Sequence, residues 1–141
     1  DGRHRFSLLL HETARAWRLR LDRRLRHLGL SQSQWLVLLK LPPEGCNQKN
    51  LADAVGVEGP TMVGLLDRLE SKGWIERCTG EEDRRTKRVR PTAKAVEARS
   101  AMQEVAGALR EDILAGLDEA GVQQCADTLE AIRRRIEALD D

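Results

Sequence analysis

Apolar residues recur at steps of three and four near both ends of the chain, a spacing that predicts amphipathic α-helices. The first such stripe runs from Leu10 to Leu28 and stops at Gly29. The next follows Ser31, whose hydroxyl can cap a helix, and is broken by Pro42-Pro43. Two longer stripes fill the C-terminal third, one after residue 92 and one after Asp118, which can cap its helix. Both flanks of the chain are therefore predicted to be helical.

The central segment, which begins at residue 47, predicts two short helices separated by a tight turn. Asn47 can cap the first helix, and Gly56 can end it because glycine accepts the left-handed backbone common at helix ends. Pro60 fits the first turn of the second helix, which Gly73 ends. The apolar residues predicted to form the buried stripe of this second helix are Val63, Leu66 and Leu69.

Two strands and a charged loop follow the helix pair. Residues 74–78 and 87–90 alternate in the manner of strands, and Pro91 closes the second one. Residues 84–94 contain six basic residues and no acid: Arg84, Arg85, Lys87, Arg88, Arg90 and Lys94. A hairpin of this charge suits contact with phosphates. The order helix, helix, strand, loop, strand is that of a winged helix-turn-helix, which places one helix in a DNA groove and the loop beside it.

The second helix of the pair has small and basic residues opposite its apolar stripe, as expected for a helix that enters a major groove. These residues are Thr61, Gly64, Arg68 and Lys72. An ordinary helical hairpin with a solvated charged face would show the same pattern. The basic hairpin that follows favours the DNA-binding interpretation over that alternative and over a winged helix that binds only protein.

The segment resembles the MarR family of bacterial transcription regulators. The matching residues are Leu51-Ala52, Pro60-Thr61, Leu66 to Glu70, Lys72-Gly73, Ile75 to Arg77, Asp83 to Arg85, Lys87, Val89 and Thr92. Within them, Asp83 and Arg85 match the wing signature of the family. Upstream, the residues similar to the SlyA branch are Ala16-Trp17-Arg18, Leu30-Ser31-Gln32, Trp35 and Leu41-Pro42-Pro43. The resemblance implies a dimer joined through its N- and C-terminal helices.

Together these features predict a DNA-binding surface made from the second helix and the hairpin. Its expected residues are Pro60, Thr61, Met62, Gly64, Arg68, Lys72, Asp83, Arg84, Arg85, Lys87 and Arg88. The sequence departs from the family at Gly64, where a basic residue is usual, and at Pro91-Thr92, where Leu-Thr is usual. The glycine removes an expected DNA contact and leaves the base preference open.

The predicted fold class is mainly α with a small β-wing. A winged helix-turn-helix over residues 31–92 lies between helical dimerisation regions at residues 1–30 and 93–141. The last helix has a heptad seam of Val122, Cys125, Leu129, Ile132, Ile136 and Leu139. Packing onto the first helix of the same chain would cover this seam, but two-fold DNA sites favour pairing with a second copy.

Composition and charge exclude several classes of protein. Only four aromatic residues are present, so base stacking on single strands is not expected. Net charge is +1, yet residues 74–94 carry +3 and residues 95–141 carry −6, so wing and C-terminal region should face different partners. No catalytic motif and no metal-ligand spacing is present, and neither an enzyme activity nor a cofactor or metal is expected. No apolar run suits a membrane span.

Three cysteines, odd in number and far apart, suit a reducing cytoplasm. Cys78 in a strand and Cys125 on the seam are both expected to be packed. Cys46, beside a glycine in a loop, is the candidate for an alternative function, a thiol-based redox sensor on the same scaffold. Such a sensor needs an accessible thiol of low pKa.

The remaining expectation concerns a small-molecule effector. Arg15, Trp17 and Arg18 lie close together on the first helix, and Ser31 and Trp35 begin the second. If the two helices fold together, these residues would line a crevice suited to an aromatic carboxylate, because arginine binds carboxylate through two hydrogen bonds. The SlyA resemblance implies such a pocket, with phenolic acids as ligands. The alternative is that both tryptophans belong to the core and the arginines are solvated or touch DNA.

Taken together, these features predict a cytoplasmic, dimeric, sequence-specific regulator of transcription. Its partners would be double-stranded DNA with a pseudo-palindromic operator, a second copy of the chain and an aromatic acid effector.

Overall fold

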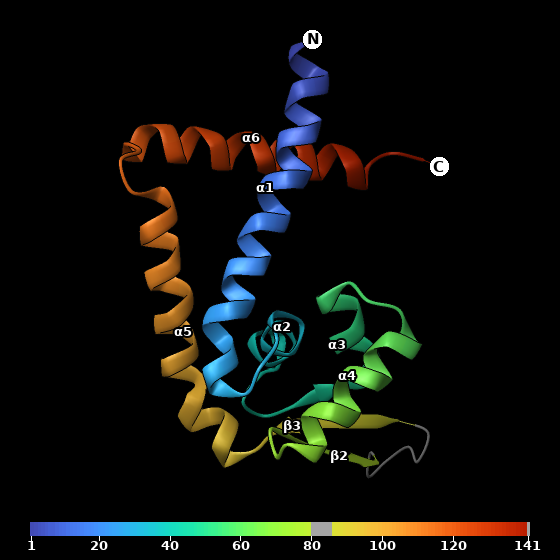
Figure 1. Cartoon of the computed structure of the whole chain (residues 1–141). Coiled ribbons are helices and arrows are strands. Elements are labelled where there is room, and N and C mark those ends of the chain that lie inside the picture. Colours follow the sequence, from blue (N-terminus) through green and yellow to red (C-terminus); the bar gives the residue numbers. More distant parts are fainter. Residues whose placement is uncertain (80–85, 141) are drawn as a thin grey trace. The chain divides into compact units, whose positions relative to one another are not determined.

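A computed structural model describes residues 1–79 and 86–140 of the chain. Helices dominate it, and the three strands that it describes form one small antiparallel sheet (Figure 1). The elements in chain order are α1 (Gly2–Leu25), η1 (Arg26–Leu28), α2 (Gln32–Lys40), β1 (Cys46–Asn47), α3 (Gln48–Val55), α4 (Gly59–Ser71), β2 (Ile75–Thr79), β3 (Lys87–Pro91), α5 (Ala93–Leu114) and α6 (Glu119–Glu137). The predicted fold class, mainly helical with a small β-wing, is confirmed.

The chain divides into two compact units, residues 1–106 and residues 107–141. The first unit contains the helix pair α3–α4, the sheet, the helices α1 and α2, and the start of α5. The second unit contains the end of α5 and all of α6.

Helix ends in the first unit follow the capping signals of the sequence. Ser31 and Gln34 form a capping box at the start of α2, in which each side chain accepts a hydrogen bond from the backbone N–H of the other residue. The Asn47 carboxamide accepts from the backbone of Lys49 and caps α3. Gly56 ends α3 with a φ of 81°, in the left-handed region that glycine tolerates best.

The sheet has the strand order β1-β3-β2, and both neighbouring pairs are antiparallel. Strand β1 was not predicted from the sequence, which indicated a loop around Cys46. It forms because Gly45, with a φ of 84°, turns the chain against β3. A Cβ atom at Gly45 would lie 2.6 Å from the Val89 carbonyl oxygen, a distance too short for any larger residue.

The core of the first unit surrounds α2, which contacts α1, α3 and α4 (Figure 1). Helix α4 contributes Met62, Leu65, Leu66 and Leu69 to this core. The sequence prediction that Val63 belongs to the buried stripe is wrong, because this side chain is 41% exposed. Six residues turn a helix through about 600°, so positions 63 and 69 lie about 120° apart around it.

In the second unit, Asp118 caps α6 as predicted, because its carboxylate accepts a 2.7 Å hydrogen bond from the Gly121 backbone. No residue of α6 is buried in the single chain. Apolar side chains of the predicted seam are open to solvent, with exposed fractions of 45% at Leu129 and 62% at Ile136. The seam thus has apolar surface that the single chain leaves exposed.

Candidate nucleic-acid interface

Helix α4 has one buried face and one open face. Pro60 and Thr61 are exposed in its first turn, and Arg68 and Lys72 are exposed towards its C-terminal end. Gly64 is half-buried between them. These five predicted DNA-binding residues therefore lie on or beside the accessible side of one helix.

Met62 does not belong to this surface, and its assignment to DNA contact is wrong. Its side chain is fully buried, with an exposed fraction of 0%. Met62, Leu66 and Leu69 follow one another at steps of four and three, which keeps them on one side of the helix and turns Met62 into the core.

Three polar contacts hold the C-terminal end of α4. The Thr92 hydroxyl donates to the Gly73 carbonyl at 2.6 Å, and the Lys94 ammonium donates to the Lys72 carbonyl at 2.8 Å. The Lys72 ammonium itself donates to the Gly29 carbonyl at 3.1 Å. Helix ends leave carbonyl groups without partners inside the helix, and cations near them also interact favourably with the helix dipole.

Lys94 has a second internal contact, because its ammonium nitrogen lies 4.2 Å from the centre of the buried Trp74 ring. A cation over an indole face is attracted by the ring quadrupole. Lys94 was counted among the basic residues of the wing from sequence. Its charge is instead used to connect the start of α5 with the end of α4.

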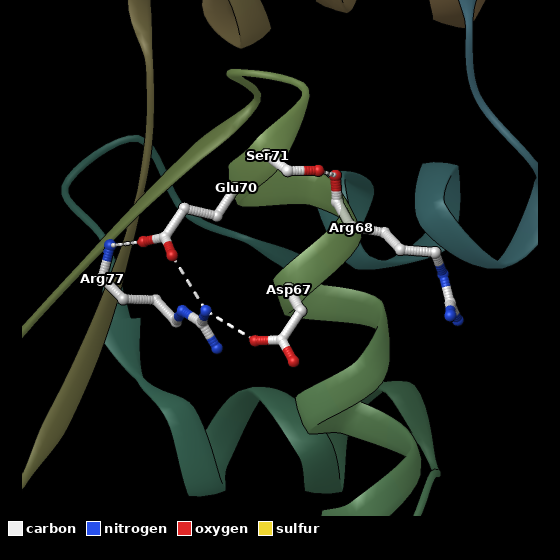
Figure 2. A network of polar contacts seen from close by, with 5 residues as sticks. All are labelled: Asp67, Arg68, Glu70, Ser71 and Arg77. Atoms are coloured by element: carbon white, nitrogen blue, oxygen red, sulfur yellow. Dashed lines mark hydrogen bonds and ion pairs between the residues drawn. The ribbon is translucent and has the colours of Figure 1, made fainter.

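On another side of α4, Arg77 of β2 binds two carboxylates of the helix (Figure 2). The Arg77 guanidinium donates to Asp67 at 2.7 Å and to Glu70 at 2.8 Å. The Arg77 backbone N–H donates to the other carboxylate oxygen of Glu70 at 3.2 Å. Glu70 therefore binds both the side chain and the backbone of one strand residue, which fixes β2 against α4.

Titration of these groups reflects the same contacts. Hydrogen bonding from Arg77 lowers the pKa of Glu70, and hydrogen bonding to Glu70 raises the pKa of Arg77. A lowered carboxyl pKa means that the contact is present above the ordinary pKa of the group. It is lost as the pH falls through the lowered pKa. The contact between β2 and α4 is thus fully charged at neutral pH.

In the sequence, Asp67, Glu70 and Arg77 match the family, but ion pairs between them were not predicted. The available signal was the spacing of Asp67 and Glu70, three residues apart on one helix, followed by a basic residue in the next strand. That pattern suggests an ion pair only when the strand is known to return along the helix.

The structure describes the wing hairpin only at its base, which consists of residues up to 79 and from 86 onwards. Lys87 is exposed and pairs with Thr79, while Arg88 is half-buried and pairs with Cys78. Asp83, Arg84 and Arg85, which the sequence assigns to the tip, lie outside the described residues. A cavity of about 730 Å³ borders the hairpin base, lined by residues that include Gln48 of α3, Gly59 of α4 and Lys87 of β3.

The predicted effector residues are distributed over α1 and the start of α2. Trp17 and Trp35 are half-buried, whereas Arg15 and Arg18 are exposed. Ser31 lines a cavity of about 270 Å³ whose lining includes Asp22, Arg26 and Lys72 but none of the other four predicted residues. The structure therefore does not gather all five around this cavity.

The cysteines differ from their predicted environments. Cys46 is half-buried in β1, and burial raises the pKa of its thiol. Because a redox sensor needs a low pKa, this finding argues against the alternative function. Cys78 and Cys125 were expected to be packed, but both are exposed. Cys78 lies on β2, which is an edge strand, and Cys125 lies on the uncovered seam of α6.

Among residues 1–79 and 86–140, no group of three or more His, Cys, Asp or Glu side chains is arranged to hold a metal ion. Within the same residues, none of the helices combines the length and the apolar character that crossing a membrane requires.

Comparison with known proteins gives results in agreement with this geometry. Residues 30–87 match the model of the MarR family. The crystal structure of transcriptional regulator PA3341 is 46% identical in sequence, with 95% of this chain and 99% of that chain covered and a TM-score of 0.82.

Two further crystal structures are more distant. CouR from Rhodococcus jostii RHA1, bound to p-coumaroyl-CoA, is 26% identical over 90% of each chain, with a TM-score of 0.79. The transcriptional regulator SlyA is 22% identical over 93% of each chain, with a TM-score of 0.82, and shares the fold. The family model covers the helix pair and most of the sheet, and the 46% identical structure extends the match to the flanking helices. This chain belongs to the MarR family, whose members are transcriptional regulators and not enzymes.

Proposed function

We propose that the protein is a dimeric, cytoplasmic regulator that binds a two-fold symmetric site in double-stranded DNA. The observation that carries the proposal is the open face of α4, where Thr61, Arg68 and Lys72 are exposed while the opposite face is buried. A helix of this kind can lie in a major groove and present several side chains to base edges and phosphates.

The wing would contact the neighbouring minor groove. Lys87 and Arg88 at its base add positive charge beside α4, and we propose that Arg85 enters the minor groove while Asp83 orients its guanidinium. A narrow groove rich in A·T pairs has an enhanced negative potential that attracts arginine. The family's wing signature, which Asp83 and Arg85 match, supports this assignment.

Arg77 contributes without touching DNA. It fixes β2, the first strand of the wing hairpin, to the helix that would enter the major groove. Helix and wing have to enter adjacent grooves together, so a fixed spacing between them lowers the entropy cost of binding. Arg77 also neutralises Asp67 and Glu70, two carboxylates that would otherwise repel nearby phosphates.

The dimer would form through the terminal helices. The α6 seam is exposed in the single chain, and so are Phe6, Leu8 and Leu9 of α1. Apolar surface of this extent on a soluble chain marks an interaction site. A second copy supplies matching seams, and a two-fold dimer presents two copies of α4 to the two half-sites.

A small aromatic or phenolic acid is proposed as the effector. Half-buried rings at Trp17 and Trp35, with exposed guanidinium groups at Arg15 and Arg18, provide aromatic and cationic surface for it. Ser31 belongs to the same region. The relative bound to p-coumaroyl-CoA, a phenolic acyl compound, supports a ligand of this chemical class. Binding would lower DNA affinity by shifting the spacing of the two recognition helices.

The first prediction is that the protein binds a duplex from the DNA around its own gene in gel-shift titrations, with strongly salt-dependent affinity. Each phosphate that is neutralised should contribute a slope of about −0.9 to the plot of log K against log salt. In the same assay, Arg85→Ala should weaken binding by about 1–3 kcal/mol without changing the melting temperature. Arg110→Ala, at an exposed position of α5, is the control and should bind normally. Binding with a flat salt dependence would refute the electrostatic part of the proposal.

The second prediction is that Arg77→Gln weakens operator binding several-fold but leaves the salt slope unchanged, because Arg77 holds the wing and contacts no phosphate. Exposed ion pairs contribute only about 0–1 kcal/mol to stability, so the melting temperature should fall little. That small difference should disappear as the pH falls through the lowered pKa of Glu70, because the carboxyl is then protonated in both proteins.

The matched control for Arg77→Gln is Arg133→Gln on α6, where Arg133 also faces two carboxylates, Glu130 and Glu137 at 3.8 Å each. This control should bind the operator normally. Equal operator affinity for wild type and Arg77→Gln would show that the fixed wing position does not contribute to binding.

The third prediction is that the wild-type protein sediments as a dimer at micromolar concentration, whereas Leu129→Glu gives monomers or insoluble chain. A buried charge in an apolar interface without a partner is strongly unfavourable. Gln124→Glu places the same charge on the same helix away from the seam and should remain dimeric. A stable wild-type monomer would contradict the proposed interface.

The fourth prediction is that salicylate quenches tryptophan fluorescence and lowers operator affinity over the same concentration range. A coupling of about 1–3 kcal/mol is typical of such effectors. Trp17→Phe and Trp35→Phe should identify the ring that reports binding, and Arg18→Ala should raise the concentration needed. Quenching without loss of DNA affinity would exclude an effector role, and no quenching would exclude the site.

A further inference from the structure

Gly64 and Arg68 lie one helical turn apart on α4, a spacing that brings side chains into contact. A Cβ atom placed on Gly64 would lie 3.9 Å from each of the two terminal nitrogens of the Arg68 guanidinium. The guanidinium thus covers the bare backbone at Gly64. It reaches towards the N-terminal end of the helix, the direction in which helical side chains normally point.

The positive charge and the N–H donors of the Arg68 guanidinium are available to bind a ligand. Figure 2 shows its side chain leaving α4 on the side away from Arg77. The two nearest acids in sequence, Asp67 and Glu70, are both bound by Arg77. Among the residues that the structure describes, no carboxylate forms an ion pair with Arg68. Its guanidinium is therefore an exposed cation with free hydrogen-bond donors on the open face of the helix.

The position of the Arg68 guanidinium along α4 determines whether it would contact base edges or phosphates. The N-terminal part of a recognition helix contacts base edges, whereas residues farther along more often meet the phosphate backbone. A side chain larger than that of alanine at position 64 would block the guanidinium from lying there. Because position 64 is glycine, the Arg68 guanidinium lies one turn closer to the N-terminus than its own Cα.

We propose that Gly64 and Arg68 act as one specificity element, in which the glycine clears the space and the arginine reads a guanine in each half-site. Guanine presents its O6 and N7 acceptors in the major groove, and the two-pronged arginine fork matches them. This inference rests on the proposed DNA-binding function. It also changes the expectation from sequence, since the contact that Gly64 removes is supplied from the next turn.

The test is a set of operator duplexes in which each base pair of the half-site is replaced in turn. For wild type, replacing the guanine should weaken binding about tenfold or more at one position of each half-site. Arg68→Ala should bind all four base pairs at that position with nearly equal affinity. Lys87→Ala, at the exposed base of the hairpin, is the control and should weaken binding to every duplex by the same factor while keeping the preference.

Two changes at Gly64 separate its role from that of Arg68. Gly64→Ala leaves ordinary van der Waals contact with the guanidinium and should keep the guanine preference. Gly64→Leu should displace the guanidinium and remove the preference, although leucine favours a helix more than glycine and the melting temperature should not fall.

The outcomes that would overturn the inference are distinct. Uniform weakening by Arg68→Ala with an unchanged preference would make Arg68 a phosphate contact. An unchanged preference in Gly64→Leu would remove the glycine from the element. A wild-type protein that binds no duplex with any base preference would instead overturn the proposed function and this inference with it.

Discussion

Helix α4 has to bury one face completely and leave the opposite face free, and the rest of the first unit is arranged around that constraint. Met62, Leu65, Leu66 and Leu69 face the core, and each such side chain contributes about 1.5–3 kcal/mol when it is fully buried. Among the described residues, the polar contacts of α4 avoid its open face, except for the hydrogen bond from Lys72 to Gly29. Arg77 approaches from β2, and Thr92 and Lys94 bind the carbonyls at its C-terminal end. The helix is therefore rigidly held while its reading surface stays accessible.

This arrangement changes how the charge of the chain should be understood. Arg77 and Lys94 are basic residues of the wing segment, yet both are engaged within the fold. Lys72 donates to the Gly29 carbonyl and contacts DNA only if that hydrogen bond is shared or exchanged. The positive charge available to phosphates is thus smaller than the sequence count suggests. It is concentrated at Arg68, at the base of the hairpin and, by prediction, at its tip.

Local signals in the sequence predicted the elements well. Capping by Ser31, Asn47 and Asp118 depends on a few neighbouring residues, so short-range rules identify it. The misassignment of Met62 and Val63 has another cause. Both are apolar neighbours on one helix, and Met62 is the one whose spacing from Leu66 and Leu69 places it on the buried side.

Contacts between segments that are distant in the chain could not be predicted from the sequence alone. The pairing of Cys46 with Val89 depends on the close approach at Gly45, and the bond between Arg77 and Glu70 depends on the path of β2 along α4. In the candidate site, the contact between Gly64 and Arg68 likewise could not be predicted from the sequence. From sequence it was a missing contact, whereas in the structure it is the place over which Arg68 lies.

We propose above all that the open face of α4, repeated by a two-fold axis, reads a specific duplex sequence. Selection of bound duplexes from a random library measures this directly and requires no assumed operator sequence. The expected result is enrichment of two inverted half-sites whose centres are about 34 Å apart, one helical turn of DNA. A pool that stays random in sequence after repeated rounds, although the protein retains DNA, would contradict it.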